Sequence, residues 1–155
     1  MPCALSEEES DALVARIEAH LRQQGFGLYA AELRREGSFL GFIGLNLPSF
    51  QAPSNPGVEV GWRLAAEYWG PGLATEGARN IVPYAFEILG LDKLVSFTVP
   101  ANTRSRRVME KLGMVHDPAE DFDHPRLPPG HPLCRHVFYR LNRSTGRPSR
   151  AAGVL

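Results

Sequence analysis

A glycine-rich turn between a strand-like run and a helical run constrains this chain more than any other feature. Residues 58–64 read Val-Glu-Val-Gly-Trp-Arg-Leu and are typical of a strand, and a helix is expected over residues 77–89. The turn reads Trp-Gly-Pro-Gly-Leu-Ala-Thr-Glu over residues 69–76. A turn of this kind at a helix start directs unpaired backbone N–H groups to one place, where the helix dipole favours an anion. The sequence therefore predicts either a tight turn into a helix or a cradle for a pyrophosphate.

The spacing of this turn excludes two common phosphate-binding motifs. No Gly-Lys-Ser/Thr follows it, as a Walker loop requires, and the third glycine of a dinucleotide fingerprint would fall at Thr75. A protein that binds ATP or NAD through the turn is a weaker hypothesis for the same reason.

Composition narrows the class of protein. A chain of 155 residues with 43% hydrophobic residues suits one globular domain. Lys+Arg and Asp+Glu are both 17, so the chain has no net charge to favour nucleic acid or an anionic membrane. No apolar run approaches the roughly 20 residues that a membrane span needs. Two cysteines, Cys3 and Cys134, make no disulfide framework, and the start of the chain has no secretory pattern, so we expect a cytoplasmic protein.

The remaining patterns predict one α/β domain over residues 1–142. Ser6 and Glu9 form a capping box for a helix that ends near Gly25, and an interior proline, Pro83, predicts a kink. Further strands are expected over residues 28–33, 39–47, 93–99 and 136–141, a helix over 102–112, and a long loop over 118–132. Residues 143–155 lack an apolar period, which predicts a disordered tail.

Three separated segments together resemble the GCN5-related N-acetyltransferases, in detail the ribosomal-protein-alanine acetyltransferase type. They are Gly-Trp-Arg-Leu at residues 61–64, the glycine turn at 69–76, and Asn-x-x-Ser…Glu-Lys-Leu-Gly-Met over 102–114. The resemblance covers about residues 6–142. It implies a central, twisted, mixed and mostly antiparallel sheet flanked by helices. The family's usual first strand and helix have no counterpart here, and an exposed sheet edge suggests a homodimer.

The same resemblance implies acetyl-CoA as co-substrate and a primary amine as acceptor. In the family, the turn holds the pyrophosphate, the preceding strand lies along the pantetheine arm, and the later Asn and Ser lie near the coenzyme. The residues implied here are Gly70, Pro71, Gly72, Leu73, Ala74 and Thr75 for the pyrophosphate, Trp62, Arg63 and Leu64 for the pantetheine, and Asn102, Ser105 and Arg107 for the rest of the coenzyme. Arg104 or Arg106 are alternatives to Arg107 as partners of the 3′-phosphate.

The chemistry requires a neutral amine to attack the acetyl thioester. Free amines are mostly protonated at neutral pH, so a general base is useful, and Glu59 is the candidate. A backbone N–H near Trp62 or Arg63 is the candidate for polarising the thioester carbonyl. Many superfamily members protonate the leaving thiolate with a tyrosine, but Met109 occupies that position here. Ser105, Tyr139 or water must then serve.

Simpler interpretations remain beside these roles. Glu59 can be a paired strand residue without a catalytic role, and Asn102 can serve only as a helix cap. Ser105 can serve only to hydrogen-bond a backbone carbonyl, and Trp69 can be a core aromatic that anchors the turn. The histidines and Cys134 of residues 124–136 match no standard zinc spacing, so no metal is expected.

The acceptor can be a protein N-terminus or a small amine. A non-catalytic acyl-CoA-binding or regulatory module is the alternative function.

Overall fold

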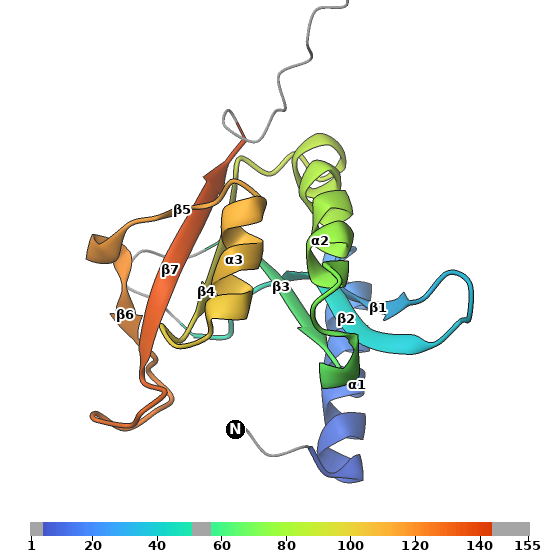
Figure 1. The fold of residues 1–155 in the computed structure, drawn as a ribbon, viewed down its shortest axis with the longest axis horizontal. Helices are drawn as coiled ribbons and strands as arrows, with labels where there is room; N and C mark the ends of the chain where they lie inside the picture. The colour runs from blue at the N-terminus through green and yellow to red at the C-terminus, as the bar shows by residue number, and fades with distance from the viewer. Residues whose placement is uncertain (1–4, 51–56, 144–155) are drawn as a thin grey trace, which may run out of the picture.

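The protein folds as a mixed sheet with helices on both faces. A computed structural model describes residues 5–50 and 57–143. Residues 144–155, which form nearly all of the expected disordered tail, lie outside the described residues. Cys3 lies outside them as well. Figure 1 shows α2 and α3 in front of the sheet and α1 behind β1 and β2. No helix among the described residues is long and apolar enough to cross a membrane.

The elements follow the predicted order with small shifts at their ends. The helices are α1 (Glu7–Gln24), α2 (Leu73–Pro83) and α3 (Thr103–Lys111), with a π turn over Tyr84–Ile88 and single 3-10 turns over Ala66–Tyr68 and Pro118–Glu120. The strands are β1 (Leu28–Glu32), β2 (Phe39–Asn46), β3 (Glu59–Leu64), β4 (Lys93–Thr98), β5 (Val115–His116), β6 (Phe122–Asp123) and β7 (Arg135–Asn142).

The seven strands form the mixed and mostly antiparallel sheet that the resemblance implied. Their order is β1-β2-β3-β4-β7-β5, and β6 pairs with β7 beside this path. Every pairing is antiparallel except that of β3 with β4. The parallel ladder has a single register pair, Glu59 with Val95, next to a bond from Val95 N–H to Val58 O. Beyond that pair β3 and β4 share no further register pair and diverge, as Figure 1 shows. We call this break in the backbone pairing of the sheet the opening.

Local sequence signals explain the first helix. The Ser6 side chain accepts a bond from the Glu9 N–H, and the Glu9 carboxylate accepts one from the Ser6 N–H, which completes the predicted capping box. Gly25, with a φ of 75°, ends the helix in the left-handed region.

The second helix corrects the predicted start at residue 77. The helix α2 begins at Leu73, directly after Gly72, because Gly72 adopts a φ of 88° and its carbonyl accepts the first intrahelical bond, from Glu76. At Pro83 the α-helical pattern ends, and a π turn follows, with a bond from Leu89 N–H to Tyr84 O. Proline has no N–H to donate to the preceding turn, which explains why the pattern changes there.

The long loop predicted over residues 118–132 is not entirely a loop. It contains a 3-10 turn and the short strand β6, and the strand β5 lies just before it. Both strands have only two residues, too few to show an alternation of apolar and polar side chains.

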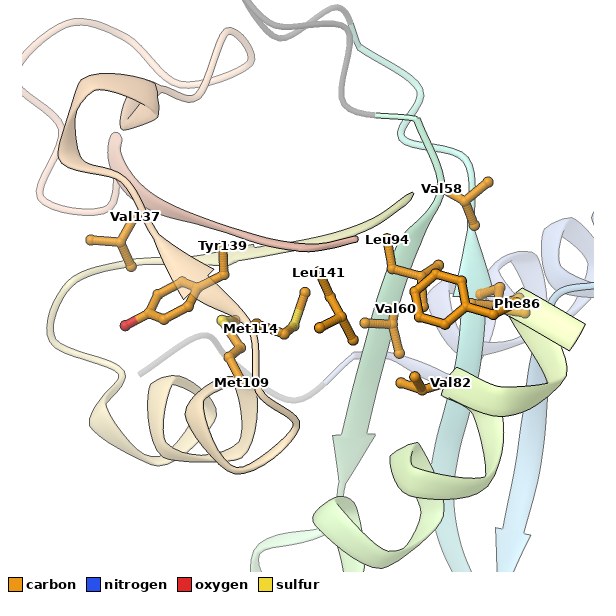
Figure 2. Packing of buried hydrophobic residues seen from close by; sticks show 12 residues of the cluster. Val58, Val60, Val82, Phe86, Leu94, Met109, Met114, Val137, Tyr139 and Leu141 are labelled. Carbon is orange, nitrogen blue, oxygen red and sulfur yellow. The ribbon is translucent and has the colours of Figure 1, made fainter. Parts of the chain in front are cut away.

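The core lies between the sheet and the two helices α2 and α3. Figure 2 shows Val82 and Phe86 gathered against Val60, Leu94 and Leu141 from three strands. Because side chains alternate along a strand, Val58 and Val60 in this core place Glu59 and Gly61 on the opposite face. The opposite face, on which α1 lies, is therefore the face that carries the candidate base.

Candidate active site

The glycine turn forms a cradle of backbone groups at the start of α2. Gly70 and Gly72 have φ values of 109° and 88°, and a Cβ built at either position meets no atom of the described part of the chain within 4 Å. The first-turn N–H groups of Leu73, Ala74 and Thr75 have no acceptor within the helix. The Thr75 side chain is buried, so this residue can offer only its backbone. Open space, positive-φ glycines and unpaired N–H groups suit a pyrophosphate.

Trp69 fixes the cradle to the end of β3. Its indole Nε1–H donates to the Leu64 carbonyl oxygen at 2.8 Å. Trp69 is 46% exposed, so its interpretation as a core aromatic is wrong, although the residue does anchor the turn. The Arg104 guanidinium lies over this ring, 4.7 Å from its centroid, which places a cation from α3 beside the cradle.

Alternate residues of β3 direct their backbone N–H and C=O groups toward the opening. The bond from Ala65 N–H to Leu40 O shows that odd-numbered residues of β3 pair with β2. The N–H and C=O of Trp62 therefore point toward β4 and the opening, as do those of Leu64, whose carbonyl is already taken by Trp69. The backbone of Arg63 points to β2, so the structure does not bring it to the opening.

The side chains of Trp62, Asn102 and Ser105 meet across the opening. The Ser105 hydroxyl accepts bonds from Trp62 Nε1 at 3.3 Å and from Asn102 Nδ2 at 3.1 Å. Asn102 also caps α3, because its Oδ1 accepts from the Ser105 N–H, and its Nδ2 donates to Thr98 Oγ1. Since both N–H groups donate to the Ser105 oxygen, the hydroxyl proton of Ser105 is left to donate elsewhere.

Tyr139, the other side chain considered for proton donation, is less well placed. The Tyr139 hydroxyl accepts from Arg106 Nε and donates to a Glu110 carboxylate oxygen, both at 3.3 Å, and its side chain is only 2% exposed. Arg106 is thereby turned toward Tyr139 and the Pro100 carbonyl. Met109, in the position of the family's tyrosine, is buried in the core. Arg107 is exposed on α3.

Glu59 lies where β3 and β4 begin to diverge. Its carboxylate is half-buried and accepts a bond from Asn46 Nδ2, on the neighbouring strand β2, at 3.3 Å. Burial raises the pKa of the Glu59 carboxyl to about 7, while the bond from Asn46 acts in the lowering direction. A carboxyl with this pKa holds and releases a proton near neutral pH, as a general base must.

Open space lies next to this carboxylate. A Cβ built at Gly61 would lie 3.8 Å from Glu59 Oε1 and would meet no other atom of residues 5–50 and 57–143 within 4 Å. Gly61 is two residues beyond the Glu59–Val95 pair, so this space borders the opening. The sequence analysis did not predict the space that Gly61 leaves beside the Glu59 carboxylate, nor the hydrogen bond from the Trp62 indole to Ser105. Gly61 and Trp62 both belong to the motif Gly-Trp-Arg-Leu, but these relationships depend on the fold.

No group of three or more His, Cys, Asp or Glu side chains within residues 5–50 and 57–143 is arranged to hold a metal ion.

Comparisons with known proteins give the family of this chain. The acetyltransferase (GNAT) domain family matches residues 1–115, and the chain belongs to that family. FsC-acetyl coenzyme A-N(2)-transacetylase of Aspergillus fumigatus is 38% identical over 96 residues, which are 59% of this chain and 40% of that protein. The chain spans about half, or less, of the length of the first curated relatives that it matches.

Solved structures share the fold over nearly the whole chain. An acetyltransferase from Agrobacterium tumefaciens C58 is 29% identical with a TM-score of 0.68, covering 92% of this chain and 75% of that one. The ribosomal-protein-S5-alanine acetyltransferase from Vibrio fischeri has a TM-score of 0.70 at 17% identity, covering 94% and 79%. The second likeness is one of fold.

Proposed function

We propose that this chain is an acetyl-CoA-dependent N-acetyltransferase that transfers acetyl to a primary amine. The observation that carries the proposal is Glu59, a carboxyl with a pKa of about 7 at the edge of the sheet opening, beside the open space over Gly61. Membership of the family and a relative named for acetyl coenzyme A support the choice of co-substrate.

The coenzyme supplies an acyl carbon activated by its thioester. The cradle at residues 70–75 binds the pyrophosphate through backbone N–H groups, with Pro71 contributing shape only because it has no N–H. Trp62 offers its backbone C=O to the pantetheine, and Leu64 offers its N–H, because the Leu64 carbonyl is already taken by Trp69. Arg104, which lies by the cradle, is better placed for a phosphate than Arg106, and Arg107 remains a candidate for the 3′-phosphate.

Glu59 accepts a proton from the attacking amine, whose nitrogen forms the new bond to the acetyl carbon while the bond from that carbon to sulfur breaks. The Trp62 N–H stabilises the negative charge that develops on the carbonyl oxygen. The Ser105 hydroxyl, held by two N–H donors, passes a proton to the thiolate directly or through water and takes one back from solvent, so the hydroxyl is restored. The acceptor is a protein N-terminus or a small amine.

The first test is calorimetric titration with acetyl-CoA. Gly72→Glu puts a carboxylate into the cradle, and binding should weaken by at least tenfold. Gly130→Glu is the matched control, because Gly130 has a similar φ of 81° and equally open surroundings in the loop before β7. Equal loss in both variants, or no binding by the unaltered protein, contradicts the assignment of the cradle.

Turnover separates the two candidate functions. An acetyltransferase releases free thiol from acetyl-CoA when an amine is added, and Glu59→Gln suppresses this release without weakening acetyl-CoA binding. Saturable binding without thiol release for any amine of a broad panel favours the acyl-CoA-binding or regulatory module.

The proposal includes a cytoplasmic setting and a homodimer. Cys134 is free and buried, which suits a reducing compartment. Among the strands that the structure describes, β1 pairs with β2 alone, and it carries the half-exposed Tyr29, so it is the edge through which a second copy would pair. Light scattering that finds a monomer at all concentrations contradicts the dimer.

A further inference from the structure

A cluster of six rings lies on the same face of the sheet as Glu59. Phe97 on β4 is within 5.6 Å, between ring centroids, of the rings of both Phe50 and Phe122. The aromatic cluster comprises Phe50, Phe97, Phe122, Phe138, His124 and His136. Its rings come from four separate segments of the chain, and several remain half-buried.

The sheet places this cluster at the opening. Val95, the register partner of Glu59, packs against the cluster, and Phe97 lies two residues further along β4. Gly61 lies two residues beyond Glu59 on β3. Because alternate residues share a face, Gly61 and Phe97 border the opening from its two sides on the face of the base. The β3 side of the opening thus has the space over Gly61 beside the Glu59 carboxylate, and the β4 side has the ring of Phe97.

The charges around the cluster disfavour a polycation. Arg126 adds a positive charge, and its guanidinium donates to Ser49 at the start of the segment that carries Phe50. Asp123 is paired with Arg135. Burial, with the charges of His136 and Arg126, lowers the pKa of His124, so this imidazole is neutral at physiological pH. The phenylalanine rings of the cluster therefore form an apolar surface, and the charge beside them that has no acidic partner among the described residues is the positive one of Arg126.

We propose that the aromatic cluster binds the unreactive part of the acceptor, and that the acceptor is a monoamine bearing an aromatic ring on a short alkyl chain. This inference rests on the proposed function. The amine occupies the space over Gly61 beside Glu59, and the ring packs by Phe97 and Phe50. Paired strands are about 4.8 Å apart and these two diverge, so a spacer of two or three carbons joins the positions.

The test compares two monoamines that carry the same single charge, together with one polyamine. With 2-phenylethylamine, kcat/KM for thiol release should exceed that with butylamine by about tenfold or more, because a ring removed from water adds binding energy. Spermidine should be poorer than 2-phenylethylamine. Equal or better turnover of butylamine or spermidine overturns the inference while leaving the acetyltransferase proposal intact.

A ring-removing variant tests the site itself. Phe50→Leu keeps most of the volume, and should raise KM for 2-phenylethylamine about tenfold with little change in kcat or in the kinetics of butylamine. Phe39→Leu, at a residue that is 64% exposed at the start of β2, is the matched control and should alter neither. The same loss for both amines in Phe50→Leu means a general structural effect and contradicts the assignment.

Binding measured without turnover distinguishes the two failures. Saturation-transfer NMR on the full chain with excess CoA should detect bound 2-phenylethylamine in the unaltered protein and weaker binding in Phe50→Leu. If no amine is acetylated but this pattern holds, the proposed function fails and the aromatic site stands. If 2-phenylethylamine does not bind, or binds equally to Phe50→Leu, the inference is rejected whatever the turnover shows.

Discussion

Asn46 Nδ2, on β2, donates a hydrogen bond of 3.3 Å to Glu59 Oε2, on the neighbouring strand β3. The two residues are register partners, so the bond is held by the sheet rather than by a flexible loop. Burial raises the pKa of Glu59, and this bond opposes the rise by stabilising the ionised carboxylate. Asn46 is therefore a positioning residue that tunes the candidate base.

Removing the Asn46 amide should move the pH profile of turnover. In Asn46→Leu the carboxylate loses its donor, so the pKa of Glu59 rises and the acidic limb of kcat/KM shifts to higher pH from its starting position near 7. Asn46→Gln should restore part of the original profile. Asn80→Leu, whose side-chain amide donates to the Glu76 carbonyl on α2, is the control. An acidic limb at the same pH in Asn46→Leu means that Asn46 does not act on Glu59.

The raised pKa of Glu59 also has a consequence for stability. Between about pH 4.5, the ordinary value, and about pH 7, the unfolded chain releases the proton that the native state keeps. The free energy of unfolding therefore falls as the pH rises through this window, and the whole of this loss is present above pH 7. Glu59→Gln removes the ionisation and should be more stable than the unaltered protein at pH 8 by about 1–3 kcal/mol, with almost no difference near pH 4.

Urea unfolding at both pH values measures this effect. Glu36→Gln, in the exposed turn between β1 and β2, is the control and should leave stability unchanged at both. A Glu59→Gln variant that is less stable than the unaltered protein at pH 8 would show that the ionised carboxylate is well solvated or well paired in the native state.

Most helices and strands of the fold could be predicted from local signals in the sequence. The capping box of Ser6 and Glu9 and the left-handed Gly25 depend on neighbours a few residues away, so the first helix was predictable. The mixed, mostly antiparallel sheet followed from the resemblance, whereas the order of its strands was not predicted. The two-residue strands β5 and β6 were not predictable, because they owe their assignment to pairing with β7 and not to a pattern of their own.

The site was predictable as a list of residues but not as an arrangement. Trp62 and Ser105 are 43 positions apart, so their bond depends on how β3 and α3 are brought together across the opening. The pKa of Glu59 depends on burial, which no spacing of residues reveals. The face on which Phe97 joins Glu59 follows from the register of β3 with β4, a non-local pairing.

The space over Gly61 gives a graded test of where the amine binds. Gly61 has no positive φ, so a side chain there strains no backbone. Gly61→Ala places a methyl 3.8 Å from Glu59 Oε1 and should lower kcat/KM for the amine severalfold, and Gly61→Leu should lower it about a hundredfold or more. Acetyl-CoA binding by calorimetry should change less than the amine kinetics. Full activity in Gly61→Leu would place the amine elsewhere.

The bond between Trp62 and Ser105 leads to a last prediction about proton donation. Trp62→Phe keeps an aromatic ring but removes the Nε1–H, so the Ser105 hydroxyl is held by Asn102 alone. The loss of this bond should cost about 1 kcal/mol of stability, and kcat should fall by less than in Ser105→Ala, which removes the donor itself. If Ser105 protonates the leaving thiolate, a thioester with a more acidic thiol needs that proton less, and Ser105→Ala should recover part of its rate with such a substrate. An equal deficit with both thioesters would assign Ser105 to positioning, since a purely structural defect does not depend on the leaving group.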